Sequence, residues 1–196
     1  MGRLQRISST LSQLNVRNTY RIVMVESNVT VFKPRGLLEE PKMISELFTA
    51  LRNILEALVV LHGCHKMHRD IRWPNVMKRV NSTGWFLIEF DSMVSSPQRS
   101  ESVPEHLSTD EHAPEMSQHE HTAAVDIWSV GFLIMSSAVP WEERRCLFSF
   151  AQWLMRDRFF DRPEGAEVLA KLLELEKAET AKTQERKTDK EALAWF

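Results

Sequence analysis

The longest regular pattern in the chain is a set of hydrophobic residues spaced three and four positions apart. It begins after Pro41 and consists of Ile44, Leu47, Phe48, Leu51, Ile54, Leu55, Leu58 and Leu61. This spacing is typical of a long helix whose apolar face lies in the core. Gly63 is well placed to end the helix. Residues 123–138 are apolar on nearly all sides and predict a second, buried helix.

Shorter apolar runs before the long helix predict strands. Residues 20–26 are β-branched and apolar, which is the composition of a buried strand. Residues 29–32 predict another strand before Pro34 and Gly36 turn the chain. Residues 1–18 are polar and mixed, and we expect them to form a loose lead-in or part of a preceding element.

The chain that follows the long helix alternates between short apolar runs and polar stretches. Residues 75–80 and 85–90 flank a turn that contains Gly84, a pattern that indicates a β-hairpin. Residues 92–121 are rich in Ser, His, Glu and Pro and show no periodicity. They therefore predict a long functional loop rather than a helix or strand.

The C-terminal part of the chain predicts more helix. One helix is expected around residues 147–154, and an amphipathic helix is expected at 164–175. Charges of both signs alternate beyond it, which predicts an exposed helix or a disordered tail. The pattern as a whole predicts a lead-in at residues 1–19, one domain at residues 20–175 and a charged tail at residues 176–196.

Composition narrows the classes of partner. The 196 residues are 43% hydrophobic and 27% charged, which is enough for one domain with a sizeable core. A formal net charge of −2 gives no basic field, so we expect neither a nucleic-acid partner nor a membrane partner. The apolar run at residues 130–138 is shorter than the ~20 residues that span a bilayer. Without an apolar secretory segment at the N-terminus, we expect an intracellular protein, in the cytoplasm or nucleus.

Candidate chemistry is concentrated in residues 68–75, His-Arg-Asp-Ile-Arg-Trp-Pro-Asn. These residues match H-R-D-x-x-x-x-N and resemble the catalytic loop of protein kinases. In such a loop a carboxylate must meet the substrate hydroxyl while an amide oxygen holds a metal ion against the phosphates. The resemblance implies that Asp70 accepts the proton of the attacking hydroxyl, that Arg72 binds the transferred phosphate and that Asn75 binds Mg²⁺.

A second segment, Leu-Ile-Glu-Phe-Asp at residues 87–91, resembles the metal-binding D-F-G of the same family. Glu89 stands where the family has aspartate, and its carboxylate is one methylene farther from the backbone. Metal binding then needs the strand or the ion to shift by about an ångström or two. The resemblance implies that Asn75 and Glu89 form the metal site. It implies an ATP site made of Glu26, Arg72, Asn75, Met77 and Glu89.

Three further matches follow in the order that the resemblance requires. Residues 112–116 (His-Ala-Pro-Glu-Met) resemble the A-P-E motif, and residues 126–131 resemble D-x-W-S-x-G. The Asp-Arg-Pro at residues 161–163 resembles a late Arg-Pro element. By this resemblance Asp126 binds the backbone of the catalytic loop. We also predict a buried ion pair between Arg162 and Glu115.

The resemblance also assigns roles to residues around the loop. His68 and Phe90 are expected to pack together and link the loop to the metal strand. Arg69 could receive a phosphate from the segment that follows, which offers several Ser and Thr side chains. The alternative is that this segment is simply a Ser-rich, solvated loop.

The upper half of a kinase domain is incomplete in this sequence. No Gly-rich loop and no strand lysine paired with a helix glutamate are found. Residues 20–26 are interpreted as the last strand of the N-lobe, and residues 27–40 as the hinge and its continuation. The resemblance implies an α+β, kinase-like fold that is mostly the helical C-lobe, with a small β-hairpin and an incomplete N-lobe. A partner could supply or cover the missing N-lobe surface.

Three functions remain open on these observations. The first is a kinase-like phosphotransferase that moves the γ-phosphate of ATP, with Mg²⁺, to Ser/Thr hydroxyls of a protein substrate. The second is a pseudokinase or truncated lobe that acts as a protein-interaction module. The third is a small-molecule phosphotransferase. Within kinases, the segments Arg-Trp-Pro-Asn and Leu-Ile-Glu-Phe-Asp look similar to Crinkler-type effectors and related fungal kinase-like domains.

Overall fold

A computed structural model describes residues 2–99, 110–117 and 120–193 of the chain. Its α-helices are α1 (Arg3–Gln13), α2 (Ile44–Gly63), α3 (Ala124–Ser136), α4 (Trp141–Arg144), α5 (Phe148–Leu154) and α6 (Gly165–Leu193). Its strands are β1 (Arg21–Glu26), β2 (Val29–Lys33), β3 (Gly36–Leu37), β4 (Lys66–Met67), β5 (Val76–Arg79), β6 (Trp85–Leu87), β7 (Val94–Ser95), β8 (Gln98–Arg99) and β9 (Glu120–His121). Single turns of 3-10 helix join several of these elements.

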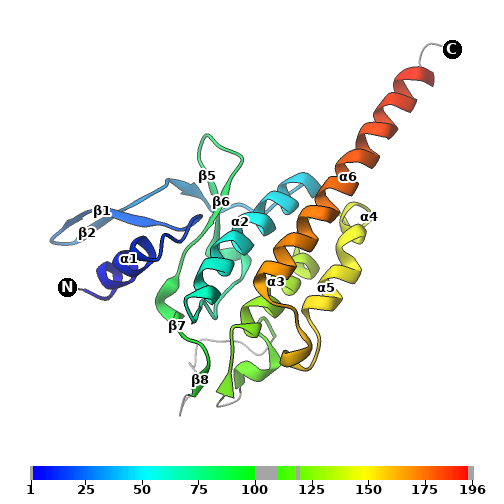
Figure 1. Ribbon diagram of the computed structural model, residues 1–196. Coiled ribbons are helices and arrows are strands. Elements are labelled where there is room, and N and C mark those ends of the chain that lie inside the picture. Colours follow the sequence, from blue (N-terminus) through cyan, green and yellow to red (C-terminus); the bar gives the residue numbers. More distant parts are fainter. Residues whose placement is uncertain (1, 100–109, 118–119, 194–196) are drawn as a thin grey trace.

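The long helix predicted from the hydrophobic spacing is α2, which forms the centre of the core. Its apolar face, from Leu47 to Leu61, is completely or almost completely buried. Helix α2 packs against α6, and α3 packs against α5 (Figure 1). Helix α3 is buried along most of its length, as its apolar sequence predicts. The predicted helices are therefore found in a single packed helical layer.

Strands β5 and β6 form the predicted hairpin and lie against α2. Strand β3 pairs with β5 and completes a small antiparallel sheet. Gly36 allows this close approach, since a Cβ at this position would lie 2.7 Å from the ring of Phe86 and 2.9 Å from Cβ of Met77. The segment that leads from β2 to α2 is thereby held against the hairpin.

The N-terminal segment is more ordered than the sequence indicates. Residues 3–13, expected in a loose lead-in or a preceding element, form helix α1. Ile7, Ser8 and Leu11 are buried on one face of the helix, and the hydroxyl of Ser8 accepts a 3.0 Å hydrogen bond from the amide of Ile22. The spacing of Ile7 and Leu11 is the helical signal, but it is too short to stand out among polar residues.

Strands β1 and β2 correct two predictions. Residues 27–40 are not all hinge, because β2 forms an antiparallel hairpin with β1. The predicted burial of residues 20–26 is also wrong, because most of β1 is exposed. The exposed fractions are 44% for Val23, 43% for Met24, 47% for Val25, 53% for Val29 and 38% for Phe32. The physical reason is that β1 and β2 pair only with each other within the described residues.

The C-terminal helix is longer than its amphipathic part. Helix α6 continues past the predicted end at residue 175 and reaches Leu193 as one element. Figure 1 shows its C-terminal half extending beyond the other helices. A helix, as in one of the two alternatives for this part of the chain, is therefore observed up to residue 193, and most of residues 176–185 are exposed. The predicted domain boundaries stay a prediction. Among the described helices, none has the length and apolar character needed to cross a membrane.

Candidate functional site

The candidate site is built around a strained loop between α2 and β5. Arg69 has φ of 72°, in the left-handed region that non-glycine residues seldom adopt. The carboxylate of Asp126, on the first turn of α3, accepts hydrogen bonds from the amides of His68 and Arg69, each 2.8 Å long. Its Oδ2 also lies 2.9 Å from Nε2 of His62, at the end of α2. The prediction that Asp126 binds the backbone of the catalytic loop is confirmed.

The charge of Asp126 is maintained despite its burial. Burial alone raises the pKa of this carboxyl group, but the hydrogen bond and the charge of His62 lower it. The charge of His68 and the amide of Arg69 act in the same direction, so the pKa lies below its ordinary value. An ionised carboxylate is therefore available to both backbone amides.

Asp70 and Asn75 are joined directly across the loop. The side-chain amide of Asn75 donates to the carbonyl oxygen of Asp70 at 2.9 Å and to its Oδ2 at 2.8 Å. Both residues are buried, with exposed fractions of 6% and 3%. Because Nδ2 of Asn75 is engaged in this way, its Oδ1 is the atom that remains to bind a cation.

Arg72 lies beside the carboxylate rather than apart from it. Its Nε lies 2.9 Å from Oδ1 of Asp70, and its Nη1 lies 3.6 Å from Oε2 of Glu111. The side chain of Arg72 is 36% exposed, so an incoming anion can reach the guanidinium. The structure thus brings Asp70, Arg72 and Asn75 together, as the sequence predicts.

His112 is a residue of the site that the sequence reasoning missed. Its Nε2 lies 3.3 Å from Oδ1 of Asp70, and only 3% of the residue is exposed. It directly precedes Ala113, Pro114 and Glu115, so its place before the A-P-E resemblance was the available signal. No spacing rule links it to Asp70, because 42 positions separate the two residues.

These neighbours set the charge state of Asp70. Burial is the largest influence and raises the pKa of the carboxyl group. The hydrogen bond from His112 and the charge of Arg72 lower it, and Asn75 and His68 add to this effect. The pKa therefore lies below its ordinary value, and Asp70 is a carboxylate at neutral pH.

Glu89 lies next to Asn75 in the segment that follows β6, two residues after the strand ends, and not on the hairpin strand where the sequence predicted it. The amide of Ile88 donates a 3.0 Å hydrogen bond to the carbonyl of Asn75, which places Glu89 one residue from a direct backbone contact with Asn75. Glu89 is exposed and has φ of 58°, so the backbone turns sharply there. The amide oxygen of Asn75 and the carboxylate of Glu89 are oxygen donors of the kind that Mg²⁺ prefers. The donor chemistry of the two side chains suits magnesium, and their role stays a prediction.

Phe90, at the start of a 3-10 turn, links this segment to the catalytic loop. Its ring meets the ring of His68 edge-on with centroids 4.5 Å apart, and Nε2 of His68 lies 3.0 Å from the carbonyl of Ile88. The predicted packing of His68 and Phe90 is confirmed. Tyr20 packs on the other side of Phe90, with ring centroids 5.8 Å apart.

Helix α1 reaches the same segment through Arg3. The guanidinium of Arg3 donates to the carbonyl of Asp91, and its Nε lies 3.6 Å from the carboxylate of Asp91. Burial raises the pKa of nearby Tyr20 to about 12, and the charges of Asp91 and Glu89 add to the effect. The N-terminal helix and the candidate metal segment are therefore in direct contact, which no sequence pattern predicted.

The other two predicted ATP-binding residues lie in different places. Met77 is on β5, two residues after Asn75, and pairs with Phe86 of β6. Glu26 is at the end of β1, next to the turn of the β1–β2 hairpin. Figure 1 shows this turn far from β5 and β6. The structure brings Met77 close to the other site residues but does not bring Glu26 there.

The segment that ends the loop region is anchored by Glu115. Arg162 donates through Nη2 to Oε2 of Glu115 at 3.0 Å and through Nη1 to Oε1, and both residues are buried. Arg162 also donates to the carbonyls of Ala124 and Arg156, at 3.1 Å and 2.8 Å. The predicted ion pair is confirmed.

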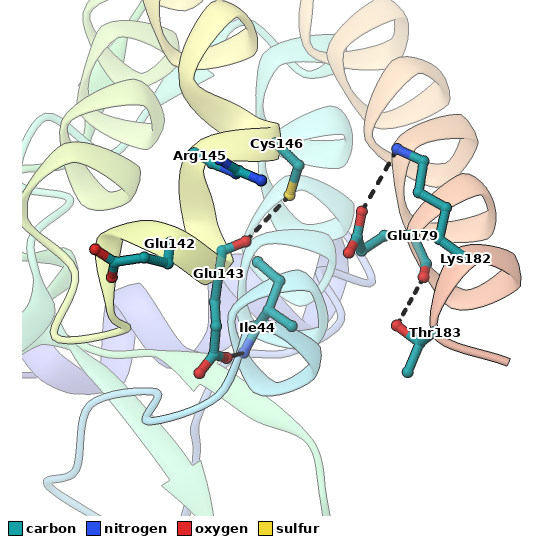
Figure 2. Close-up of a pocket in the computed structure, with 8 residues that line it drawn as sticks. All are labelled: Ile44, Glu142, Glu143, Arg145, Cys146, Glu179, Lys182 and Thr183. Carbon is teal, nitrogen blue, oxygen red and sulfur yellow. Dashed lines mark hydrogen bonds and ion pairs between the residues drawn. The ribbon is translucent and has the colours of Figure 1, made fainter. Parts of the chain in front are cut away.

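A separate hollow of about 590 Å³ lies between the start of α2, α4 and α6 (Figure 2). None of its lining residues belongs to the catalytic loop. The carboxylate of Glu143 accepts from the amide of Ile44 at 3.3 Å, and Glu179 lies 3.8 Å from Lys182. Because these charges are partnered within the protein, we interpret the hollow as a groove between helices.

Comparison with known proteins gives consistent matches. A family model described as "Protein kinase domain" matches residues 15–185. The chain is 44% identical over 154 residues to Crinkler effector protein 8 of Phytophthora infestans, covering 74% of this chain and 26% of that protein. It is 32% identical over 146 residues to mitogen-activated protein kinase kinase kinase 3 of Arabidopsis thaliana, covering 71% of this chain and 23% of that protein. The chain thus spans about a quarter of the length of these two relatives.

Proposed function

Because this chain belongs to the protein kinase family, we propose that it transfers the γ-phosphate of ATP to a serine or threonine hydroxyl of a protein. Membership of the family confirms the resemblance and the α+β, kinase-like fold predicted from the sequence. The observation that carries the proposal is the convergence of Arg72 and Asn75 on the carboxylate of Asp70. Transfer to serine or threonine, rather than to another hydroxyl, is part of the proposal.

The proposed chemistry assigns one step to each residue. Asp70 accepts the proton of the attacking substrate hydroxyl. The oxygen of that hydroxyl forms a bond to the γ-phosphorus, while the bond between the γ-phosphorus and the β-phosphate oxygen breaks and ADP is released. Arg72 leaves Oδ1 of Asp70 and binds the transferred phosphoryl group. Asn75 and Glu89 would hold Mg²⁺, which when bound offsets the charge of the phosphates.

Substitution of Asp70 tests this assignment. The chain is incubated with Mg²⁺ and γ-labelled ATP on a general acceptor protein, and Asp70→Ala is compared with the unchanged chain. Loss of the general base should lower phosphate transfer by about 10²–10⁴-fold. Asp157→Ala, at an exposed position away from the loop, should leave transfer unchanged. Equal transfer by Asp70→Ala would refute the assignment.

A second candidate function is a protein-interaction module without turnover. It is favoured by the exposed apolar hairpin of β1 and β2, and by Glu89 in place of aspartate. We propose that this hairpin is covered by a partner that supplies further β-strands, because both strands have a free edge within the described residues. Lack of thermal stabilisation by Mg²⁺-ATP would favour this second function, since a bound ligand stabilises the folded state.

The small-molecule phosphotransferase is the weakest of the three candidates. The segment around Glu115 is anchored to Arg162 in the core, and Asp126 braces the loop beside it. In the protein kinase resemblance, these elements build the platform that a protein substrate occupies. Their presence supports a protein substrate over a small one.

A further inference from the structure

We propose that His112 is a positioning residue that holds the carboxylate of Asp70 in the orientation needed to accept the substrate proton. The inference rests on the proposed phosphotransfer and adds a residue to it. His112 lies on the segment before helix α3, not on the catalytic loop itself. It would act through Asp70 and not by touching the nucleotide.

The geometry of the Asp70 carboxylate carries this inference. Oδ2 accepts from Nδ2 of Asn75 at 2.8 Å, while Oδ1 is approached by Nε of Arg72 at 2.9 Å and by Nε2 of His112 at 3.3 Å. Since a carboxylate oxygen is an acceptor only, Nε2 of His112 carries the hydrogen of this contact. The two oxygens are therefore contacted by three side chains, two from the catalytic loop and one from the segment before α3.

The role of His112 follows from the movement of Arg72 away from Asp70 during the proposed reaction. In the proposed reaction Arg72 moves to the phosphoryl group, and one lone pair of Oδ1 becomes available to the substrate hydroxyl. The carboxylate rotates about the Cβ–Cγ bond as one planar group, and Asn75 alone would then restrain it through Oδ2 only. His112 keeps the second oxygen fixed, so the available lone pair continues to face the hydroxyl. Such orientation matters, because small displacements of a reacting group cost large factors in rate.

The backbone around His112 is rigid enough for this task. Ala113 and Met116 are buried in an apolar cluster with Met67, Val125 and Trp128. Glu115, three positions after His112, is fixed by Arg162. The histidine itself is almost completely buried, which restricts its ring to a narrow range of positions. The ring is thus fixed from the core side, independently of the catalytic loop.

The neighbouring residue connects the same segment to Arg72. Oε2 of Glu111 lies 3.6 Å from Nη1 of Arg72, while His112 holds Asp70. Two successive side chains of one segment therefore contact Arg72 and Asp70 of the catalytic loop. A phosphate that draws Arg72 away must break its contact with Glu111 but leaves the contact of His112 intact. This difference separates the positioning role of His112 from that of Glu111.

Steady-state kinetics of the full chain test the proposal with three variants. His112→Leu removes the donor at similar volume, whereas His112→Gln retains an N–H group that can reach Asp70. His121→Gln is the matched control, because His121 is equally buried but lies on β9, paired with Gln98. We expect His112→Leu to lower kcat by about 100-fold, with KM for ATP changed by less than about threefold. His112→Gln should recover most of the loss, and His121→Gln should leave kcat unchanged.

The opposite results are equally clear. The proposal is overturned if kcat of His112→Leu stays within about twofold of the unchanged chain, or if His112→Gln is no better than His112→Leu at equal melting temperature. The imidazole ¹⁵N resonances of His112 give a readout that needs no turnover. Asp70→Asn should shift the Nε2 resonance of His112, and an unchanged resonance would refute the contact. A chain that transfers no phosphate yet shows this shift would disprove the proposed function while retaining the contact.

Discussion

Arg162 and Glu115 form a two-pronged ion pair although they are 47 positions apart in the chain. Their side chains are exposed by only 0% and 5%. The pair joins the segment that carries His112 to the start of α6 and, through the carbonyl of Ala124, to the start of α3. It therefore fixes the relative positions of three elements around the candidate site.

Removing one partner of this pair should destabilise the protein strongly. Glu115→Leu or Arg162→Met would leave a buried charge without its partner, and we expect each to lower the free energy of unfolding by about 3–5 kcal/mol. Urea denaturation followed by circular dichroism measures the change. The double variant should cost less than the sum of the two single variants, because neither charge then remains.

The exposed pair of Lys171 and Glu174 provides the control for that experiment. Its side chains are 52% and 68% exposed. Glu174→Gln should not change the urea midpoint measurably, because exposed ion pairs contribute little. A similar loss in Glu174→Gln and Glu115→Leu would mean that burial of the ion pair does not determine its contribution.

His68 should make the protein sensitive to mild acid. Burial lowers the pKa of His68 below its ordinary value, with partial opposition from Asp126. The unfolded state then binds a proton that the folded state does not. The free energy of unfolding should fall as pH drops below about 6.5, by at most about 1.4 kcal/mol per pH unit from this group.

Comparison of two histidine variants checks this pH dependence. His68→Gln should flatten the decline in urea midpoint between pH 7 and pH 5. His65→Gln, at an exposed position, should keep the slope of the unchanged chain. An identical slope in His68→Gln and the unchanged chain would show that another group is responsible.

Glu89 should control the response to magnesium. Glu89→Ala would remove one of the two proposed oxygen donors, so Mg²⁺-ATP should raise the melting temperature of this variant less than that of the unchanged chain. Glu89→Asp would restore the shorter carboxylate of the family motif, and we expect it to bind at least as tightly. Glu164→Ala, exposed and remote from the loop, serves as the control. A full magnesium response in Glu89→Ala would remove Glu89 from the metal site.

The exposed face of the β1–β2 hairpin should promote association. Val23→Thr with Val25→Thr reduces the apolar surface while keeping β-branched residues in the strand. We expect this double variant to bind less of a hydrophobic dye and to sediment with less self-association. Phe160→Ser removes a hydrophobic residue elsewhere that is 66% exposed, more than Val23 or Val25, and should still have a smaller effect. Equal behaviour of the two variants would argue against a special role for the hairpin.

Residues with a fixed spacing were predictable from the sequence. Asp70 and Asn75 lie in one loop, so the motif determines which side chains meet. Glu115, Asp126 and Arg162 were found because each carries its own short motif, and the structure places them as predicted. The long helix was predicted because its periodicity extends over several turns.

Other features depend on contacts between distant parts of the chain and had no such signal. His112 meets Asp70 only through the path of the segment before α3. Arg3 meets Asp91 only because α1 packs beside the 3-10 turn that contains Asp91. The composition of β1 indicates a buried strand, but burial depends on what lies against the strand. Within the described residues, only β2 pairs with β1.

Asp126 and Asp70 differ in whether the fold depends on them. Asp126 holds a strained backbone and His62 in place, so a lineage that abandoned catalysis would still need it in order to fold. Asp70, Asn75 and His112 mainly hold one another, so such a lineage could lose them without losing the fold. If the proposed phosphotransfer holds, loss of His112 together with Asn75 among descendants of this chain would mark the branches in which it has ceased.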